Sequence, residues 1–256
     1  MTVKHWLRDF ALRNLTEEQY GRLREFIYYR GSIVQIIQEK IWRRINIGRR
    51  TYIDPTAHFL GSKNIAIGDD CVISEHCCFN VNYRHGRDVA IEIGDHSFIG
   101  RRNFFSSGRR IRVGSYALTG IDCRFLSSGH VFSNPMEPYI ATGTTHDNEI
   151  DIGVNCWIGT GVTILGNIKV GHGCVIGAGA FVLTDIPAFS LAIGTPARVV
   201  KRYDLERQEW VSTEEFTAAQ AELLPDEARY LEILRAARPY IMMPRPAAGR
   251  AWGHLP

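Results

Sequence analysis

An aliphatic side chain returns at every sixth position through the middle of this chain. The series runs without a slip through Ile152, Ile158, Ile164, Val170, Ile176 and Val182. A period of six matches neither the 3.6-residue period of an α-helix nor the two-residue period of a half-buried strand. It is typical of a parallel β-helix, in which short strands and tight turns wind into a prism. The repeat therefore predicts an all-β solenoid core.

Distances between equivalent residues of successive coils reveal insertions, because three hexads make one coil of about 18 residues. Val170 follows Ile152 by 18 positions, so nothing is inserted there. Ile152 follows Val113 by 39 positions, which leaves 21 residues beyond one coil and predicts a long loop over 131–151. A smaller insertion is expected near 80–90. Insertions in solenoids gather on one face, frequently the binding face.

The chain divides into three parts. Residues 1–50 are expected to form a helical N-terminal cap, since isoleucine recurs at every fourth position and would form an apolar stripe of Ile33, Ile37, Ile41 and Ile45. Residues 51–203 are expected to form the β-helix. Residues 204–256 are expected to be a helical extension with a tail, in which one helix begins with a cap at 212–215 and a second covers 225–238.

The composition is that of an ordinary soluble protein, with 45% hydrophobic and 22% charged residues in a chain of 256. No stretch approaches the ~20 apolar residues of a membrane-spanning helix, and the N-terminus lacks the apolar core of a signal peptide. A cytoplasmic location is therefore expected. The net charge of +3 is too small to indicate a nucleic-acid partner.

Positive charge is concentrated near the N-terminus. Residues 1–50 hold eleven Lys and Arg against five Asp and Glu, with several aromatic residues among them. Such a segment is compatible with peripheral contact with an anionic membrane surface, which would place the protein at the inner face of the membrane. A solvated helical face packed on the end of the solenoid is the simpler explanation.

The six cysteines follow the repeat. Five of them stand four residues after a repeat position, where a β-helix takes a small inward side chain: Cys71, Cys77, Cys123, Cys156 and Cys174. Free cysteine behaves as a small hydrophobe, so this phase predicts packing, with only Cys78 out of step. No two cysteines have the C-x-x-C spacing of zinc or redox motifs, and no metal site is expected.

Three short motifs in the C-terminal half of the repeat are more specific: Trp-Ile-Gly at 157–159, Gly-Ala-Gly at 177–179 and Gly-Thr-Pro-Ala at 194–197. In this order and at these distances they resemble the hexapeptide-repeat acyltransferases, above all the O-acetyltransferases of sugars, capsule and lipopolysaccharide. The resemblance covers roughly residues 52–203. It implies a left-handed parallel β-helix, a rare exception to right-handed crossovers. It also implies a homotrimer with active sites between neighbouring prisms and acetyl-coenzyme A as the acyl donor.

The catalytic histidine of that family stands at the end of a coil, where a long loop leaves. His130, which ends the segment 125–130, matches this position. Acetyl transfer from a thioester to a hydroxyl needs a base near neutral pH, and histidine has the pKa for this role. His130 is therefore the candidate general base. Other histidines are expected to be solvated or structural, namely His58, His76, His85, His96 and His172.

The resemblance also implies residues that bind the acyl donor, which are Trp157, Gly159, Gly177, Ala178, Thr184, Arg198 and Lys201. The ring of Trp157 would lie near the cofactor, the small residues would let the pantetheine arm approach the backbone, and the basic pair would meet the phosphates. Thr184 departs from the family pattern, because many relatives have lysine there. Arg202 is a candidate to supply the missing phosphate contact.

Acceptor contacts are expected from the two insertions, at Asn82, Tyr83, Arg84 and His146. Four arginines at consecutive turns are candidates either for contact with an anionic acceptor or for a solvated edge: Arg101, Arg102, Arg109 and Arg110. The long loop and the terminal extensions favour a carbohydrate acceptor larger than a free disaccharide. A surface polysaccharide, a lipopolysaccharide or a nucleotide-linked sugar is the hypothesis.

Two other functions stay open beside sugar O-acetylation. N-acetylation of an amino sugar or a nucleotide sugar would use the same base and cleft, and a non-catalytic β-helix scaffold would need neither. A hexapeptide-repeat carbonic anhydrase is disfavoured, because no two histidines have the five-residue spacing that resembles its metal ligands. A nucleotidyltransferase with a β-helical tail is excluded, since no nucleotide-binding domain precedes the repeat in this sequence.

Overall fold

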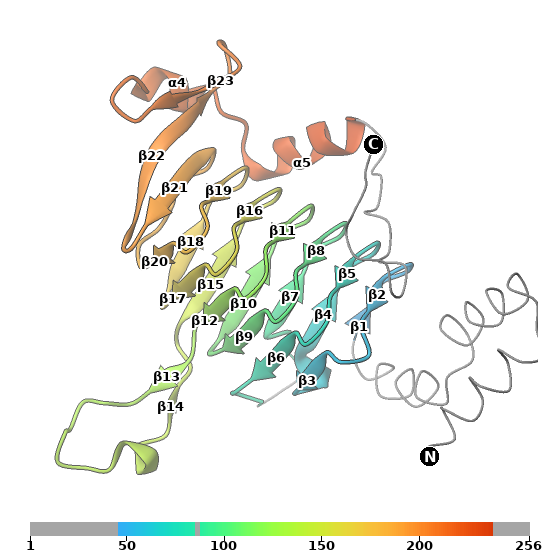
Figure 1. Cartoon of the computed structure of the whole chain (residues 1–256), viewed down its shortest axis with the longest axis vertical. Helices are drawn as coiled ribbons and strands as arrows, with labels where there is room; N and C mark the ends of the chain where they lie inside the picture. Colours follow the sequence, from blue (N-terminus) through green and yellow to red (C-terminus); the bar gives the residue numbers. More distant parts are fainter. Residues whose placement is uncertain (1–45, 85–87, 238–256) are drawn as a thin grey trace, which may run out of the picture. The chain divides into compact units, whose positions relative to one another are not determined.

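The computed structural model describes residues 46–84 and 88–237 (Figure 1). The described residues exclude the expected N-terminal helices and the tail after 237. They also exclude the basic segment proposed for membrane contact, apart from its last residues, which begin with the first strand. Within the described part, the chain passes through three parallel sheets in turn, and each circuit forms one coil of a three-sided prism. The solenoid expected from the repeat is therefore confirmed.

Each side of the prism is one sheet, named A, B or C below. Sheet A contains β1 (Asn46–Ile47), β4 (Ile65–Ile67), β7 (Ile91–Ile93), β10 (Arg110–Val113), β15 (Glu149–Ile152) and β18 (Ile168–Val170). Sheet B contains β2 (Tyr52–Ile53), β5 (Val72–Ile73), β8 (Phe98–Ile99), β11 (Leu118–Thr119), β16 (Trp157–Ile158), β19 (Val175–Ile176), β21 (Ser190–Gly194), β22 (Ala197–Asp204) and β23 (Glu209–Ser212). Sheet C contains β3 (His58–Leu60), β6 (Cys78–Val81), β9 (Phe104–Ser107), β12 (Arg124–Leu126), β17 (Thr163–Leu165) and β20 (Phe181–Val182).

The interior is filled by stacks of like side chains, one from each coil. In sheet C the rings of Phe79, Phe105 and Phe125 are fully buried, and successive ring centroids lie 4.6 and 4.5 Å apart. In sheet A, Ile111 lies beside Ile150 in the same way. Hydrogen bonds hold neighbouring strands about 4.8 Å apart, so each coil must present a side chain of similar size at the same position. This requirement explains the six-residue period.

Five of the six cysteines are inside the prism, as the phase predicts. The buried, unpaired cysteines are Cys71, Cys77, Cys123, Cys156 and Cys174, whereas Cys78 is partly exposed. Burial raises the pKa of the Cys71 and Cys123 thiols to about 11 and that of Cys77 to about 12. These three thiols therefore stay protonated near neutral pH and act as small apolar core groups.

Both expected insertions are present. The short one joins β6 to β7, and a 3₁₀ turn, η1 (Ser62–Asn64), lies one coil below it. The long one leaves sheet C after β12 and opens as an antiparallel ribbon of β13 (Gly129–His130) and β14 (Thr144–Thr145), with a second 3₁₀ turn, η2 (Tyr139–Ala141), between them. Because β15 begins at Glu149, the insertion covers 127–148 rather than 131–151.

Antiparallel strands close the last coil and continue past 203 into the extension that was expected to be helical. β21 pairs with β22, and β22 pairs with β23, so the C-terminal extension begins as a continuation of sheet B. The expected helix cap at 212–215 is wrong, because Ser212 is the last residue of β23 and a turn follows at 213–215. The short α4 (Ala218–Glu222) begins later, with Thr217 in its capping box. The second helix, α5 (Glu227–Ala236), begins close to its expected position.

Helix α5 is held against the corner between sheets A and B. Glu227 forms an ion pair with Arg112 at 3.1 Å and accepts a hydrogen bond from the Val154 amide at 3.1 Å. One turn later, the Tyr230 hydroxyl accepts from the side-chain amide of Asn155 at 2.5 Å. The helix is therefore fixed to two adjacent coils by polar contacts.

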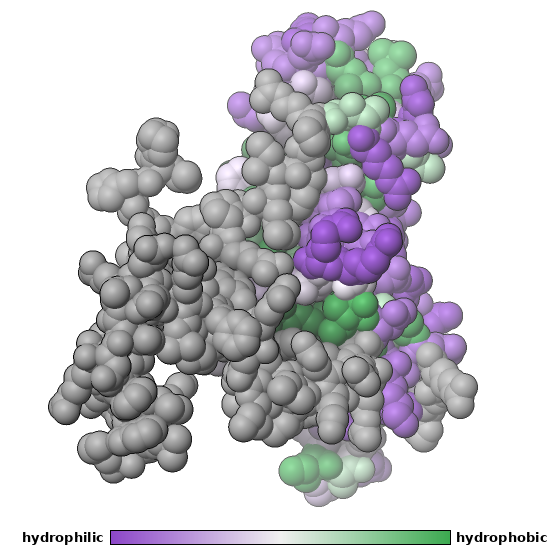
Figure 2. All heavy atoms as spheres, turned by 90° about the vertical axis from the view of Figure 1, so that its right-hand side faces the viewer, coloured by the Kyte–Doolittle hydropathy of each residue, from purple (hydrophilic) through white to green (hydrophobic). Residues whose placement is uncertain are grey.

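The outer faces of the sheets differ in polarity. On sheet A, one row across the strands alternates in charge through Glu92, Arg112, Asp151 and Lys169. On sheet B, the corresponding row is apolar and contains Phe98, Leu118 and Trp157. On the side shown in Figure 2, the described surface is largely hydrophilic, with smaller hydrophobic areas. No helix among the described residues is long and apolar enough to cross a bilayer.

The phenylalanine stack provides a test of coil packing. Phe105→Ala removes the middle ring of three buried rings and is expected to lower the free energy of unfolding by about 3–5 kcal/mol, since the neighbouring coils cannot collapse into the cavity. Phe132→Ala is the control, because that ring is 77% exposed, and its effect is expected to stay within about 0.5 kcal/mol. Chemical denaturation measures both. Equal effects of the two substitutions would contradict the stacking account.

Candidate functional site

His130 is the last residue of β13, at the base of the long insertion. Its side chain is exposed, and its cross-strand partner on β14 is Thr144. On one side of it, the Gly129 amide donates to the Thr145 hydroxyl at 3.0 Å. On the other side, the Val131 amide donates to a carbonyl of the returning segment at 3.1 Å. The ribbon therefore presents an exposed imidazole on a backbone that is hydrogen-bonded on both sides, which suits a group that must meet a reactant.

His146 directly follows β14, the strand that pairs with the strand of His130. Residues directly opposite each other in an antiparallel pair share a face, and side chains alternate along each strand. Thr144, which is opposite His130, therefore shares its face, and the ladder ends at Thr145. The His146 ring stacks on the ring of Tyr83, with centroids 4.4 Å apart. The two insertions thus meet here, and two of the predicted acceptor residues lie together.

Asn82 and Arg84 use part of their side chains to hold the short insertion in place. The Asn82 amide donates to the Ser106 hydroxyl at 2.8 Å and accepts from Asn80 at 2.7 Å. Arg84 donates from Nε to the carbonyl of Val81 at 2.8 Å. Both residues therefore support the loop that carries Tyr83, and direct contact with an acceptor stays a prediction.

Three of the four clustered arginines are neutralised by carboxylates. The pairs are Arg102 with Asp122 at 2.7 Å, Arg109 with Glu149 at 3.0 Å, and Arg110 with Glu92. The bidentate hydrogen bonds from Arg102 hold the pKa of the Asp122 carboxyl below its usual value. An anion bound by these guanidiniums would have to displace a carboxylate partner. The pairing therefore favours the second expectation, a solvated edge, over an anion-binding cluster.

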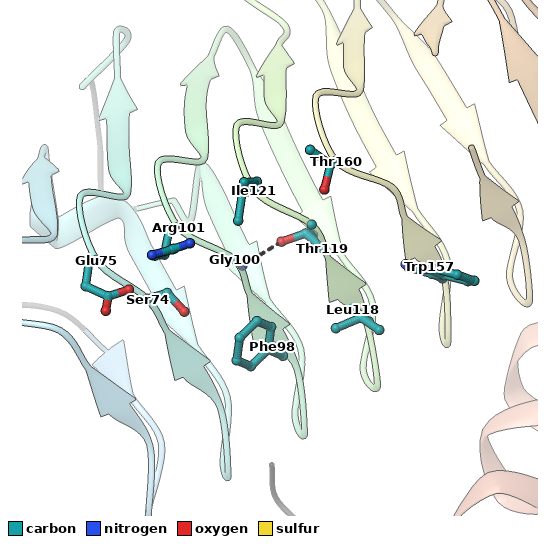
Figure 3. A pocket seen from close by; sticks show the side chains of 11 residues that line it. Ser74, Glu75, Phe98, Gly100, Arg101, Leu118, Thr119, Ile121, Trp157 and Thr160 are labelled. Atoms are coloured by element: carbon teal, nitrogen blue, oxygen red, sulfur yellow. Dashed lines mark hydrogen bonds between the residues drawn. The ribbon is translucent and has the colours of Figure 1, made fainter. Parts of the chain in front are cut away.

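A shallow pocket of about 350 Å³ lies on the outer face of sheet B and the corner that leads to sheet C (Figure 3). Phe98, Leu118 and Trp157 line it side by side, because the register of β8, β11 and β16 aligns them. Trp157 is 54% exposed, so its ring is available to a ligand. Only this tryptophan was predicted. Phe98 and Leu118 could have been predicted from their phase in the repeat, since each directly precedes an inward repeat residue.

The row that contains Trp157 continues to the C-terminal end of sheet B. It crosses β19 and β21 and reaches Lys201 on β22. Three strand spacings separate the two residues, a distance of about 14 Å. Arg198 is exposed on the same strand and donates to the neighbouring Ala197 carbonyl at 2.8 Å. The predicted basic pair therefore lies beyond the apolar part of the row, while Thr184 is exposed after β20.

Arg202 is directed into the protein. Its guanidinium donates to the Ala188 carbonyl at 3.0 Å and lies 4.5 Å from the centroid of the Phe216 ring. Burial lowers the pKa of this guanidinium from its usual value. The expectation that Arg202 replaces the lysine missing at Thr184 is therefore not supported, since the side chain is occupied by packing.

Gly159 and Gly177 are explained by the stacking of coils. A Cβ on Gly159 would lie 2.6 Å from the Ala178 amide nitrogen, and a Cβ on Gly177 would lie 2.6 Å from a side chain of the next strand. The open backbone is two residues further along, at Gly161 and Gly179, where a Cβ would meet nothing within 4 Å. These two glycines, with the exposed Ala178, leave a strip without large side chains beside the pocket. Contact of the pantetheine arm with Gly159, Gly177 and Ala178 stays a prediction.

The other described histidines have structural surroundings or solvent around them. His172 has Nε2 2.9 Å from the Pro225 carbonyl oxygen, and His96 stacks on Tyr116 with centroids 4.8 Å apart. His58 and His76 are exposed. Within residues 46–84 and 88–237, no group of three or more His, Cys, Asp or Glu side chains is placed to hold a metal ion.

One chain does not bring His130 and Trp157 together. The ribbon leaves the prism at the corner between sheets C and A. Trp157 points outward from sheet B, which is the side opposite that corner in a three-sided prism. The predicted acceptor residues are thus near His130, and the predicted donor residues form a separate surface.

The chain is similar to known proteins in its repeat and its fold. The family model described as bacterial transferase hexapeptide (six repeats) matches residues 150–184. No curated protein sequence matches the chain. Among solved structures, a variant of AntD, an N-acyltransferase from Bacillus cereus in complex with dTDP-4-amino-4,6-dideoxyglucose and coenzyme A, is 19% identical, with 78% of this chain and 96% of that chain covered and a TM-score of 0.56.

Two further structures are similar at lower TM-scores. A hexapeptide-repeat acetyltransferase from Vibrio cholerae O1 biovar eltor, complexed with acetyl-coenzyme A, is 24% identical over 71% of this chain and 84% of that chain, with a TM-score of 0.48. A maltose O-acetyltransferase from Clostridium difficile 630 is 22% identical over 76% and 85%, with a TM-score of 0.44. The fold shared with AntD confirms the expected left-handed parallel β-helix. Residues 150–184 thus match the model of the bacterial transferase hexapeptide repeat, and the described chain shares its fold with the N-acyltransferase AntD.

Proposed function

We propose that this protein is an acetyltransferase that moves an acetyl group from acetyl-coenzyme A to a hydroxyl of a sugar in the cytoplasm, during the synthesis of a surface polysaccharide or lipopolysaccharide. The observation that carries the proposal is the exposed His130, held on a hydrogen-bonded ribbon at the base of the long insertion of a hexapeptide β-helix. The solved structures with the same fold include acyltransferases crystallised with coenzyme A.

His130 is the general base in the proposed reaction. It takes the proton from the acceptor hydroxyl while the oxygen attacks the thioester carbonyl. The tetrahedral intermediate then collapses, the C–S bond breaks, and the leaving thiolate of coenzyme A receives the proton from the imidazolium. The acetyl ester and free coenzyme A result, and the histidine returns to its neutral form.

The row across sheet B supports the donor assignment. A thioester and pantetheine arm need an apolar surface, and the phosphates of coenzyme A need cations. Trp157 belongs to the apolar part of the row, and Lys201 lies about 14 Å away on β22, the strand that also carries Arg198. The length and polarity of the row therefore match an extended acetyl-coenzyme A. Thr184, Gly161 and Gly179 border the same surface in this proposal.

The separation of the two surfaces supports a homotrimer as part of this proposal. His130 and Trp157 lie on opposite sides of one prism, so a complete site requires His130 of one copy and the sheet B row of another. A head-to-tail contact of this kind closes into a ring when the rotation permits. Three copies would then make three equivalent sites, as the family resemblance implies.

N-acylation of an amino sugar is the second candidate function. It is favoured by the fold shared with AntD, whose structure holds dTDP-4-amino-4,6-dideoxyglucose beside coenzyme A. The same base and donor surface would serve, because an amine nucleophile must also lose a proton. Mass spectrometry of the product distinguishes an alkali-labile ester from an alkali-stable amide.

Replacing the base tests the mechanism. His130→Gln is expected to lower the rate of coenzyme A release with a sugar acceptor by about 10²–10⁴-fold, the usual contribution of a general base. Acetyl-coenzyme A binding, measured by calorimetry, is expected to be unchanged. His58→Gln is the matched control, because His58 is also exposed and lies on a strand of sheet C away from the ribbon. A His130→Gln rate within threefold of the parent would refute the assignment.

The open strip tests the donor surface. Gly161→Asn is expected to weaken acetyl-coenzyme A binding about tenfold or more, since its side chain would enter open space next to Thr160, which lines the pocket. Gly161 has φ 71°, and Asp122, at the same corner of the preceding coil, has φ 60°. Because a residue with a side chain already adopts this left-handed conformation there, the substitution should change stability little. His76→Asn, at the equivalent position of an earlier coil, is the control. Unaltered affinity in Gly161→Asn, measured by calorimetry, would remove the strip from the donor site.

A further inference from the structure

We infer that the part of the acceptor bound beside the two insertions carries no phosphate or carboxylate, and that the site selects a neutral or cationic sugar by charge. The inference rests on the proposed function. It concerns a groove of about 870 Å³ on the outer face of sheet A. Tyr83 of the short insertion and His146 of the long one form part of its wall.

Carboxylates dominate the described lining of this groove. The ionisable residues along it, apart from His146, are Asp88, Glu92, Asp147, Glu149, Arg109 and Arg110. Four carboxylates against two guanidiniums leave an excess of two negative charges. In a concave site the low-dielectric walls concentrate such a field, which attracts cations and repels anions.

The two arginines are paired with carboxylates, so they do not present free positive charge to a ligand. Arg109 is paired with Glu149 at 3.0 Å, and Arg110 is paired with Glu92. A phosphate would therefore have to displace a carboxylate from its guanidinium while it approached the remaining acids. Among the described residues, Asp88 and Asp147 are in no ion pair, so their charges are the ones a ligand meets.

The position of the groove connects it to the reaction. His146 directly follows β14, the strand that pairs with the strand of His130, so the groove wall and the proposed base belong to the same insertion. Its ring stacks on Tyr83, whose side chain is 42% exposed. An acceptor ring placed against this aromatic pair would have hydroxyl or amino groups near Asp147, on the insertion that carries the proposed base. A diphosphate of a nucleotide-linked sugar would have to lie outside the groove.

Charged thiol reagents measure the field without knowledge of the acceptor. Val89→Cys places a thiol in the groove wall at a side chain that is 37% exposed, and Leu165→Cys provides a control thiol on the outer face of sheet C at 39%. Both are made in a Cys78→Ser background, because the other five native thiols are buried. The reaction rates with a trimethylammonium-bearing and a sulfonate-bearing methanethiosulfonate are then compared.

The ratio of the rate with the cationic reagent to the rate with the anionic reagent is expected to be about tenfold higher at position 89 than at position 165. Two nearby carboxylates would produce a difference of this size. Adding Asp88→Asn and Asp147→Asn is expected to bring the ratio at position 89 down to the control value. A ratio equal to the control before these changes, or one that they leave unaltered, would overturn the inference.

A pair of acceptors tests the consequence for catalysis. Glucosamine is expected to be acetylated at least tenfold faster than glucosamine 6-phosphate, and the double Asp→Asn variant is expected to reduce this preference. Faster reaction of the phosphorylated sugar would overturn the inference even if the reagents report a negative groove. Failure of the proposed function is distinguishable, because it appears as absent acetyl-coenzyme A binding while the reagent ratios are unaffected.

Discussion

Successive coils of the prism are joined through backbone hydrogen bonds that run along its axis, as when the Gly153 amide donates to the Val170 carbonyl at 2.8 Å. Every backbone pair of this kind fixes the spacing of two coils, and the inward side chains must then fill the space that this spacing leaves. Like residues consequently stack on like residues, as in the Phe79–Phe105–Phe125 column. Glycines such as Gly159 occur where the next coil comes closest.

The same ladder leaves the outward positions available for chemistry. Because stability comes from the inward stacks, the outward row on sheet B can hold an exposed Trp157 beside Leu118 with no loss of packing in the core. Insertions are tolerated at corners, where the ladder is already interrupted by turns. His130 stands on such an insertion, and its ribbon is ordered by its own hydrogen bonds rather than by the solenoid.

The repeat period was enough to predict the solenoid, its inward residues and the inward cysteines, since these depend on spacing along the chain alone. Ion pairs between coils could not be predicted, because they depend on which outward residues become neighbours. Arg110 and Glu92 lie 18 residues apart and meet only when one coil is stacked on the next. The inward turn of Arg202 and the extended conformation at Val211 were missed for a similar reason, since tertiary packing overrode local preferences.

For the candidate site, the sequence by itself determined that His130 stands at the start of a long insertion and that Trp157, Arg198 and Lys201 follow in the C-terminal coils. The order of these residues and their positions in the repeat can be read directly from a linear sequence. Only the tertiary structure decided that His146 stacks on Tyr83, that most of the clustered arginines are neutralised, and that His130 and Trp157 lie on opposite sides of one prism. Such relations depend on how the coils and insertions are placed in three dimensions, because residues far apart in sequence become neighbours only when the chain has wound back on itself.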